Sequence, residues 1–188
     1  MADCGLCTIG NDKYRVVVEN DYAVAAMIFN PVNATHQNIV PRRHVTEINQ
    51  FAPEEAKGVF DLQYEVQRRL MELFPDHPPV IGIQTGKLAT QPHKHWQAFS
   101  SDAHLRQLYA RAHEVAPTPI GGKGIIWIDL RTHPNVPGTE NDNPDAQQNL
   151  ERFLSSAAES LRGTGNLERD RRQLRDLTHK LLLYNGFF

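Results

Sequence analysis

The first part of the chain alternates short apolar runs with turn residues, which is the pattern of an antiparallel sheet. Residues 14–28 carry two apolar runs around the polar turn Glu19-Asn20-Asp21, so we predict a strand, a tight turn and a second strand. Asn38-Ile39-Val40 predicts a third strand that ends at Pro41. Two further strands are predicted for residues 80–85 and 92–99.

Helices are predicted between and after these strands. Pro53 suits the first turn of a helix, Glu54 and Glu55 suit its positive end, and apolar residues then recur at helical spacing as far as Phe74. Weaker patterns predict a helix over residues 103–114, a strand over 124–130, and two helices over 144–161 and 166–182. Strands with one helix, followed by helices and without an internal repeat, indicate an α+β fold.

Composition narrows the class of protein. The 188 residues are 40% hydrophobic and 22% charged, as in globular domains, and the net charge of -2 gives no general attraction for nucleic acid or an anionic membrane. No apolar run approaches the roughly 20 residues that span a bilayer, and the N-terminal residues lack the apolar core of a signal peptide. We therefore expect a cytoplasmic protein with neither a nucleic-acid nor a membrane partner.

The chain has two cysteines, Cys4 and Cys7, in a C-x-x-C arrangement. This spacing suits a metal site or a redox pair better than a structural disulfide. A redox pair fits poorly, because no helix is predicted to start after Cys7. A metal site and a pair of unligated reduced thiols both stay open at this point.

The segment around His93 and His95 is the other candidate for chemistry. If residues 92–99 form a strand, His93, His95 and Gln97 share one face, while Lys94 points to the other face and to solvent. Two imidazoles on one face can supply a metal ligand, a nucleophile, or both. The H-x-H pattern by itself does not decide between these roles.

This segment, with Gln84-Thr85-Gly86 and an Ala-Thr turn before it, resembles the histidine-triad (HIT) superfamily signature. The H-x-H-x-Q form is similar to that of the transferase branch, which includes galactose-1-phosphate uridylyltransferases and diadenosine tetraphosphate phosphorylases (ATP adenylyltransferases), whereas the hydrolase branches carry histidine where Gln97 stands. Supporting segments occur in the expected order over residues 4–99, among them Thr35-His36 and Val40-Pro41-Arg42-Arg43-His44.

The resemblance implies a fold and a division of the chain. We expect an α+β, HIT-like antiparallel sheet with a long helix over residues 1–115. Residues 116–188 would form a C-terminal extension, with one strand and helices that pack on this domain.

The resemblance also implies roles for the two catalytic candidates. His95 would attack the α-phosphorus of a nucleotide and form a nucleotidyl-histidine intermediate, and a neutral imidazole is chemically suited to that step. Gln97 would donate its amide N–H to a phosphate oxygen. Because an amide cannot deliver a proton, Gln97 favours phosphate over water as the acceptor.

Other residues are assigned to binding by the same resemblance. Phe29 and Asn30 would line the base and ribose pocket, and Gln84, Thr90 and Gln91 would contact the nucleotide or its phosphates. The metal site would hold a structural zinc on two thiolates and two imidazoles, with iron as the second metal to consider. Its ligands would be Cys4, Cys7, His44 and His93.

Together these expectations describe a nucleotidyltransferase. The expected reaction is phosphorolysis of a dinucleoside polyphosphate such as diadenosine tetraphosphate, with transfer of AMP to phosphate, by a homodimer. Three different functions stay open: a HIT-type nucleotide hydrolase, a different transferase such as a sugar-1-phosphate uridylyltransferase or an adenylylsulfate phosphorylase, and a non-catalytic nucleotide-binding domain.

Overall fold

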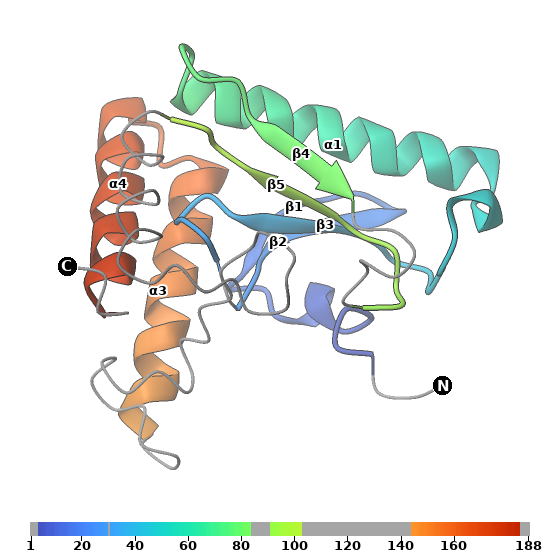
Figure 1. Cartoon of the computed structure of the whole chain (residues 1–188), viewed down its shortest axis with the longest axis horizontal. Coiled ribbons are helices and arrows are strands. Elements are labelled where there is room, and N and C mark those ends of the chain that lie inside the picture. The colour runs from blue at the N-terminus through green and yellow to red at the C-terminus, as the bar shows by residue number, and fades with distance from the viewer. Residues whose placement is uncertain (1–3, 30, 84–90, 103–143, 185–188) are drawn as a thin grey trace, which may run out of the picture.

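The computed structural model describes residues 4–29, 31–83, 91–102 and 144–184, and its centre is a five-stranded antiparallel sheet of order β1-β2-β3-β5-β4. A long helix lies along one face of this sheet, and two C-terminal helices pack at one end of it (Figure 1). The predicted α+β architecture, an antiparallel sheet with a long helix and C-terminal helices, is therefore confirmed. The elements are η1 (Ile9–Asn11), β1 (Val16–Glu19), β2 (Ala23–Met27), β3 (Gln37–Pro41), η2 (Ile48–Gln50), α1 (Pro53–Leu73), β4 (Val80–Ile83), β5 (Trp96–Phe99), α3 (Pro144–Arg162) and α4 (Leu167–Tyr184).

The predicted first hairpin is present, and Asn20 closes its turn. The Asn20 side-chain oxygen accepts hydrogen bonds from the backbone N–H groups of Tyr22 and Ala23, both at 2.9 Å, as asparagine commonly does in turns. Its amide nitrogen donates to the Gly58 carbonyl oxygen at 2.8 Å, which ties the hairpin to α1. A side chain at position 58 would collide with the Tyr22 side chain, so the close approach of the hairpin to α1 requires glycine there.

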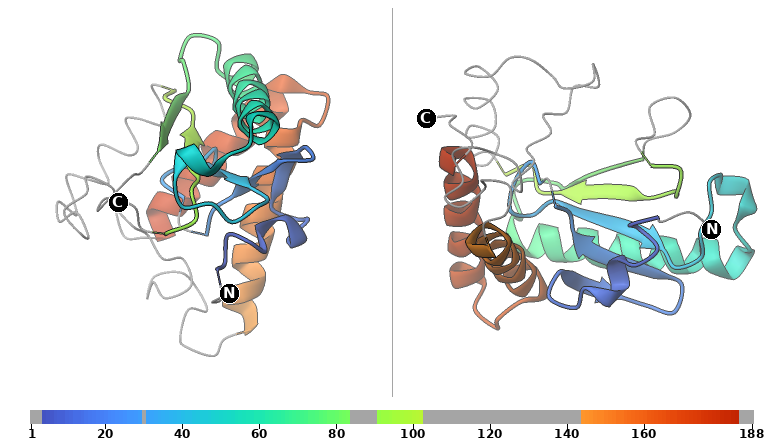
Figure 2. Two further views of the ribbon diagram at one scale, coloured as in Figure 1. Left: turned by 90° about the vertical axis from the view of Figure 1, so that its right-hand side faces the viewer. Right: turned by 90° about the horizontal axis from the view of Figure 1, so that it is seen from below.

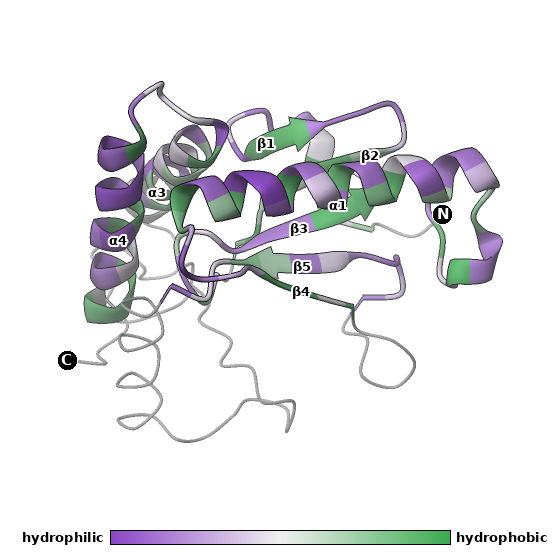
Figure 3. Cartoon of the chain, turned by 90° about the horizontal axis from the view of Figure 1, so that it is seen from above, coloured by the Kyte–Doolittle hydropathy of each residue, from purple (hydrophilic) through white to green (hydrophobic). Residues whose placement is uncertain are grey.

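Each face of the sheet has its own apolar layer. Ala25, Ile39 and Ala98 belong to the core beneath α1, which also includes Val66 and Leu70 of that helix. The opposite face has a smaller core, whose members are Ile9, Val16, Val24, Ala26 and Val40. Because side chains alternate along a strand, β2 is buried at every position. The long helix turns its buried apolar stripe, which includes Val59, Leu62, Val66 and Leu70, to the sheet, and its other residues are mostly polar (Figure 3).

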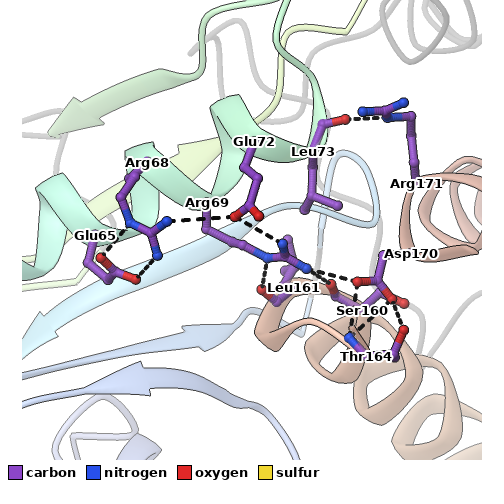
Figure 4. Close-up of polar contacts among 10 residues, drawn as sticks. All are labelled: Glu65, Arg68, Arg69, Glu72, Leu73, Ser160, Leu161, Thr164, Asp170 and Arg171. Carbon is purple, nitrogen blue, oxygen red and sulfur yellow. Dashed lines mark hydrogen bonds and ion pairs between the residues drawn. The ribbon is translucent and has the colours of Figure 1, made fainter. Parts of the chain in front are cut away.

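The C-terminal helices are part of the same core, and α3 packs against β1 and β2 (Figure 2). A polar cluster fastens them to α1 (Figure 4). Arg69 of α1 donates to the carbonyl oxygens of Leu161 and Ser160 at 3.0 and 3.2 Å and pairs with buried Asp170 at 2.8 Å. Asp170 also accepts from the hydroxyl of Thr164 at 2.6 Å. This carboxylate therefore joins the end of α3 and the start of α4 to the long helix.

The structure corrects one predicted element. The last strand starts at Trp96 and not at residue 92, so both histidines of the H-x-H pair precede it. Pro92 has no N–H that could donate a hydrogen bond to a neighbouring strand. The backbone N–H of Lys94 donates to the Val45 carbonyl oxygen in the loop after β3, at 2.7 Å, and not to a neighbouring strand.

The helices predicted for 53–74, 144–161 and 166–182 are confirmed to within a few residues. The helix and strand predicted for 103–114 and 124–130, together with residues 84–85 at the end of the fourth strand, lie outside the described residues. The division into 1–115 and 116–188 stays a prediction. In the described parts of the chain, no helix is both long and apolar enough to cross a membrane, and a cytoplasmic location stays a prediction.

Candidate active site and metal centre

His95 lies immediately before β5, and its ring is fixed by the backbone of the same loop. Its Nδ1 is 2.9 Å from the carbonyl oxygen of His93. A carbonyl oxygen can only accept, so Nδ1 carries the hydrogen and Nε2 keeps its lone pair. The sequence could not name this acceptor. Nε2 of His95 therefore has the protonation state that a nucleophile needs.

Burial keeps this imidazole neutral. His95 is 4% exposed, and burial lowers its pKa. The nearby Lys94 ammonium group lowers this pKa further, and the hydrogen bond to the His93 carbonyl raises it in part. Lys94 was expected to be solvated, but it is buried and 4% exposed. The prediction was wrong because Lys94 precedes β5, so strand alternation does not set the direction of its side chain.

Gln97 lies on the face of the sheet opposite α1. It is directly across from Asn38 of β3 and is 9% exposed. Ile39 and Ala98, the neighbours of these two residues, point to α1, so alternation places Gln97 and Asn38 together on the other face. His36 is on this face too. The centre of its ring lies 5.2 Å from that of Phe99, and Phe99, two residues after Gln97 in β5, is on the same face as Gln97.

Sequence reasoning gave no role to His36 or Asn38. Both are buried polar residues next to Gln97. For Asn38 the sequence did carry a signal. It is a polar residue in a strand that continues with the apolar residues Ile39 and Val40, and a polar residue at such a position is a candidate for a specific role. For His36 the signal was its place in the Thr35-His36 segment of the resemblance.

The four predicted metal ligands come together although three segments supply them. The ligand atoms of Cys4, Cys7, His44 and His93 all lie within 4.8 Å of one another. Nδ1 of His93 is 3.6 Å from Cys4 Sγ and 3.5 Å from Cys7 Sγ, and Nδ1 of His44 is 3.2 Å from Cys7 Sγ. A tetrahedral zinc with ordinary bond lengths separates sulfur and nitrogen ligands by about 3.5 Å. The cluster therefore has the donors and spacing to hold a metal ion.

The ring of His93 is oriented for a metal by its other nitrogen. Nε2 lies 3.1 Å from the Pro41 carbonyl oxygen and donates to it, so Nδ1, the atom facing the sulfurs, has the free lone pair. Burial lowers the pKa of His93, and the electrostatic interaction with the neighbouring His44 ring lowers it further. Burial and the neighbouring Cys4 thiol raise the pKa of Cys7. A cation between the sulfurs would reverse that effect, because it favours the thiolate.

The predicted nucleotide-binding residues are only partly described. Phe29 is half-buried, and the guanidinium carbon of Arg15 lies 3.8 Å from the centre of its ring. Arg15 is itself buried, and it donates to the Met27 carbonyl oxygen and pairs with Asp12. Gln91 is exposed next to the histidines. Asn30, Gln84 and Thr90 lie outside the described residues, so their roles stay predictions.

Comparison with known proteins gives a match to a family model that spans one half of the chain. Residues 10–103 match the HIT domain family. A zinc-bound histidine triad family protein from Mycobacterium smegmatis is similar at 17% identity and a TM-score of 0.49, over 83% of this chain and 93% of that one. A hypothetical protein from Leishmania major is 25% identical, with a TM-score of 0.48, over 53% of this chain and 74% of that one.

A diadenosine triphosphate hydrolase from Plasmodium falciparum, solved in complex with cyclomarin A, is 18% identical to this chain. Its TM-score is 0.45, over 60% of this chain and 80% of that one. No curated protein matches the sequence significantly.

Proposed function

The chain belongs to the HIT domain family, and from this premise we propose that it is a nucleotidyltransferase that forms a nucleotidyl-histidine intermediate on His95. The observation that carries the proposal is the hydrogen bond that fixes the ring of this residue. The His93 carbonyl fixes the His95 tautomer with Nε2 free, and the residue two positions further along the chain is Gln97, which carries an amide and not an imidazole. This combination favours the transferase branch over the hydrolases.

The first step is attack on phosphorus. Nε2 of His95 bonds to the α-phosphorus of a dinucleoside polyphosphate, and the bond from that phosphorus to the bridging oxygen breaks. With diadenosine tetraphosphate, the leaving group is ATP and AMP stays on the histidine. Gln97 donates an amide hydrogen to a non-bridging oxygen as negative charge develops there.

The second step transfers the AMP to an acceptor. An oxygen of inorganic phosphate attacks the same phosphorus, the bond to Nε2 breaks, and ADP is released with His95 again neutral. Phosphate is already ionised at neutral pH, so its attack needs no base. Water would need one, and the Gln97 amide cannot take a proton.

The proposed role of the Cys4, Cys7, His44 and His93 cluster is a structural zinc site. Two thiolates and two imidazoles complete a tetrahedron, so no position is open for substrate. A zinc ion bound there supplies crosslinking and no chemical step. The chain's own contribution is that His93 belongs to this cluster through its ring and holds His95 through its carbonyl group.

We assign the remaining predicted residues to binding the nucleotide. Arg15 covers one side of the Phe29 ring, which supports a base pocket formed by Phe29 and Asn30. Gln84, Thr90 and Gln91 would contact the phosphates. Residues 1–115 would form the catalytic domain and 116–188 its extension.

The proposed assembly is a homodimer, and an apolar flank of α1 supports it. Phe60, Tyr64 and Met71 lie on one side of the helix and are 67%, 63% and 48% exposed. The opposite flank, which carries Glu65, Arg69 and Glu72, borders β1. The apolar flank must therefore lie on the side of β4.

Strand β4 forms the sheet edge on this side and pairs only with β5 among the described strands. An exposed edge strand can pair with a second copy of itself around a twofold axis, and the two apolar flanks would then meet. The substitution Tyr64→Glu should convert a dimer to a monomer in sedimentation velocity. Arg172→Glu on the exposed face of α4 is the control and should leave the dimer intact.

The test of the reaction is intact-protein mass spectrometry with diadenosine tetraphosphate. Without phosphate, the wild-type protein should gain the mass of AMP, and the His95→Ala variant should not. Addition of phosphate should remove the adduct and release ADP. A hydrolase would instead release AMP at the same rate with or without phosphate.

A different transferase and a non-catalytic domain would each give their own result in the same assay. An adduct that forms only with a uridine diphosphate sugar or an adenylylsulfate would assign a different transferase. No adduct with any nucleotide donor, with binding retained, would indicate a non-catalytic nucleotide-binding domain and overturn the proposal.

A further inference from the structure

Two buried polar atoms beside Gln97 have no hydrogen-bond partner in the described structure. They are Nε2 of His36 and Oδ1 of Asn38. Asn38 lies directly across from Gln97 in the ladder between β3 and β5, and His36 precedes it by two residues on the same face. Buried polar atoms are rarely left unpaired in native proteins, so these two need an explanation.

The two atoms are chemically opposite. The backbone N–H of Val32 donates to Nδ1 of His36 at 3.1 Å, so the hydrogen of this imidazole is on Nε2, which is a donor. Burial lowers the pKa of His36 to about 3, which keeps the ring neutral, and the Gln97 side chain beside it opposes this fall. Oδ1 of Asn38 is an acceptor. A primary amide such as that of Gln97 offers one acceptor and one donor group.

We propose that His36 and Asn38 are positioning residues that hold the Gln97 amide in one orientation. Nε2–H of His36 donates to Oε1 of Gln97, and Oδ1 of Asn38 accepts one hydrogen from Nε2 of Gln97. One orientation of a single side chain thus satisfies both unpaired atoms. The second amide hydrogen of Gln97 is left for a ligand.

This inference rests on the proposed function, in which Gln97 must present a hydrogen to a phosphoryl oxygen. A rotated amide would present its own oxygen to that group, and two oxygens that both carry negative charge repel. Preorganised donors act only if they already point to the place where charge develops. His36 and Asn38 would ensure this without touching the substrate.

Asn38→Leu is the variant to test, because His36 also accepts the Val32 N–H and its loss would disturb the loop before β3. The control is Gln37→Leu. Gln37 is the adjacent residue of the same strand, and its Oε1 is also buried without a partner. The Gln37 side chain points to the α1 face, away from Gln97. Ile39, two residues further along the same strand, belongs to the core beneath α1, and residues two apart on a strand share a face.

The first measurement needs no substrate. In protein labelled with ¹⁵N-glutamine, the side-chain NH₂ signals of Gln97 are identified by their loss in Gln97→Leu. They should show slowed solvent exchange, and Asn38→Leu should shift them and abolish the protection, whereas Gln37→Leu should leave them unchanged. Signals that stay the same in Asn38→Leu would overturn the proposal and indicate bridging water.

The second measurement is the rate of AMP adduct formation in a double-mutant cycle. Asn38→Leu should slow this rate about tenfold when Gln97 is present, and should have no further effect in the Gln97→Ala variant. An equal loss in both backgrounds would show that Asn38 acts independently of Gln97 and would overturn the proposal. If the wild-type protein forms no adduct, the proposed function fails, and the exchange measurement alone decides the orientation of Gln97.

Discussion

The carbonyl oxygen of His93 accepts a hydrogen bond from Nδ1 of His95 at 2.9 Å, while the ring of His93 faces the sulfurs of Cys4 and Cys7. One residue therefore belongs to the Cys4, Cys7, His44 and His93 cluster through its side chain and orients the proposed nucleophile through its backbone. Movement of the His93 backbone would change the direction of the His95 ring. The integrity of this cluster is thereby linked to the orientation of the proposed nucleophile.

Loss of the metal should destabilise the protein more than it slows chemistry. The purified protein should contain about one zinc per chain, and Cys4→Ser should remove it. We expect the melting temperature to fall by roughly 5 °C or more, which corresponds to about 2 kcal/mol for a chain of this size. Elemental analysis and thermal unfolding provide the measurements. His77→Ala, outside the cluster, should keep the metal, and a metal-free wild type of full stability would reject the site.

A histidine at position 97 should open the intermediate to water. Gln97→His introduces a group that can exchange a proton with the attacking water, and general acid–base catalysis of this kind contributes about 10²-fold or more. The ratio of AMP to ADP formed from diadenosine tetraphosphate in the presence of phosphate should therefore rise. Gln97→Leu, which can neither donate a hydrogen bond nor carry a proton, should lower both products. An unchanged product ratio in Gln97→His would count against the assigned role of the amide.

The contact between α1 and the C-terminal helices should contribute strongly to stability. Asp170 is fully buried, and Asp170→Ala removes the buried carboxylate that pairs with the partly buried Arg69, which keeps only its more exposed partner Glu72 and two carbonyl oxygens. The loss of one member of a buried pair costs about 3 kcal/mol, which urea denaturation can measure. The neighbouring residue Arg68 pairs with Glu65 on the exposed side of α1, so Arg68→Ala should change the unfolding midpoint little. Equal effects of the two substitutions would contradict this assignment.

His36 should make the protein sensitive to mild acid. Its pKa is about 3 in the folded protein and 6.5 as a reference, so the unfolded chain binds a proton more readily. The contribution of His36 to stability is complete above about pH 6.5 and is lost progressively as the pH falls from there toward 3. The burial of His93 and His95 acts in the same direction.

The share of His36 is obtained by comparison with a variant that cannot titrate at that position. The unfolding free energy of His36→Gln, measured between pH 7 and 5, should fall less than that of the wild type. Identical pH profiles would assign the acid sensitivity to other groups.

The local part of the architecture could be predicted from the sequence. Alternating apolar positions gave the hairpin and β3, and the start at Pro53 with its helical spacing gave α1, because these signals depend on neighbours a few residues apart. The start of β5 could not be predicted this way. The backbone N–H of Lys94 bonds to the carbonyl oxygen of Val45, which is far away in the sequence. Lys94 therefore stands outside the strand, and the alternation that predicted a solvated side chain does not apply to it.

The sequence by itself determined which chemical groups the protein has: a C-x-x-C pair, the H-x-H-x-Q segment and the His44 segment that resembles a zinc ligand. Only the tertiary structure decided how they act. It places four candidate ligand atoms from three segments within 4.8 Å of one another, gives His95 its tautomer through the His93 carbonyl, and sets His36 and Asn38 beside Gln97. The physical reason is that tautomers, burial and unpaired polar atoms are properties of spatial neighbours, and strand pairing brings these together from positions that no local pattern connects.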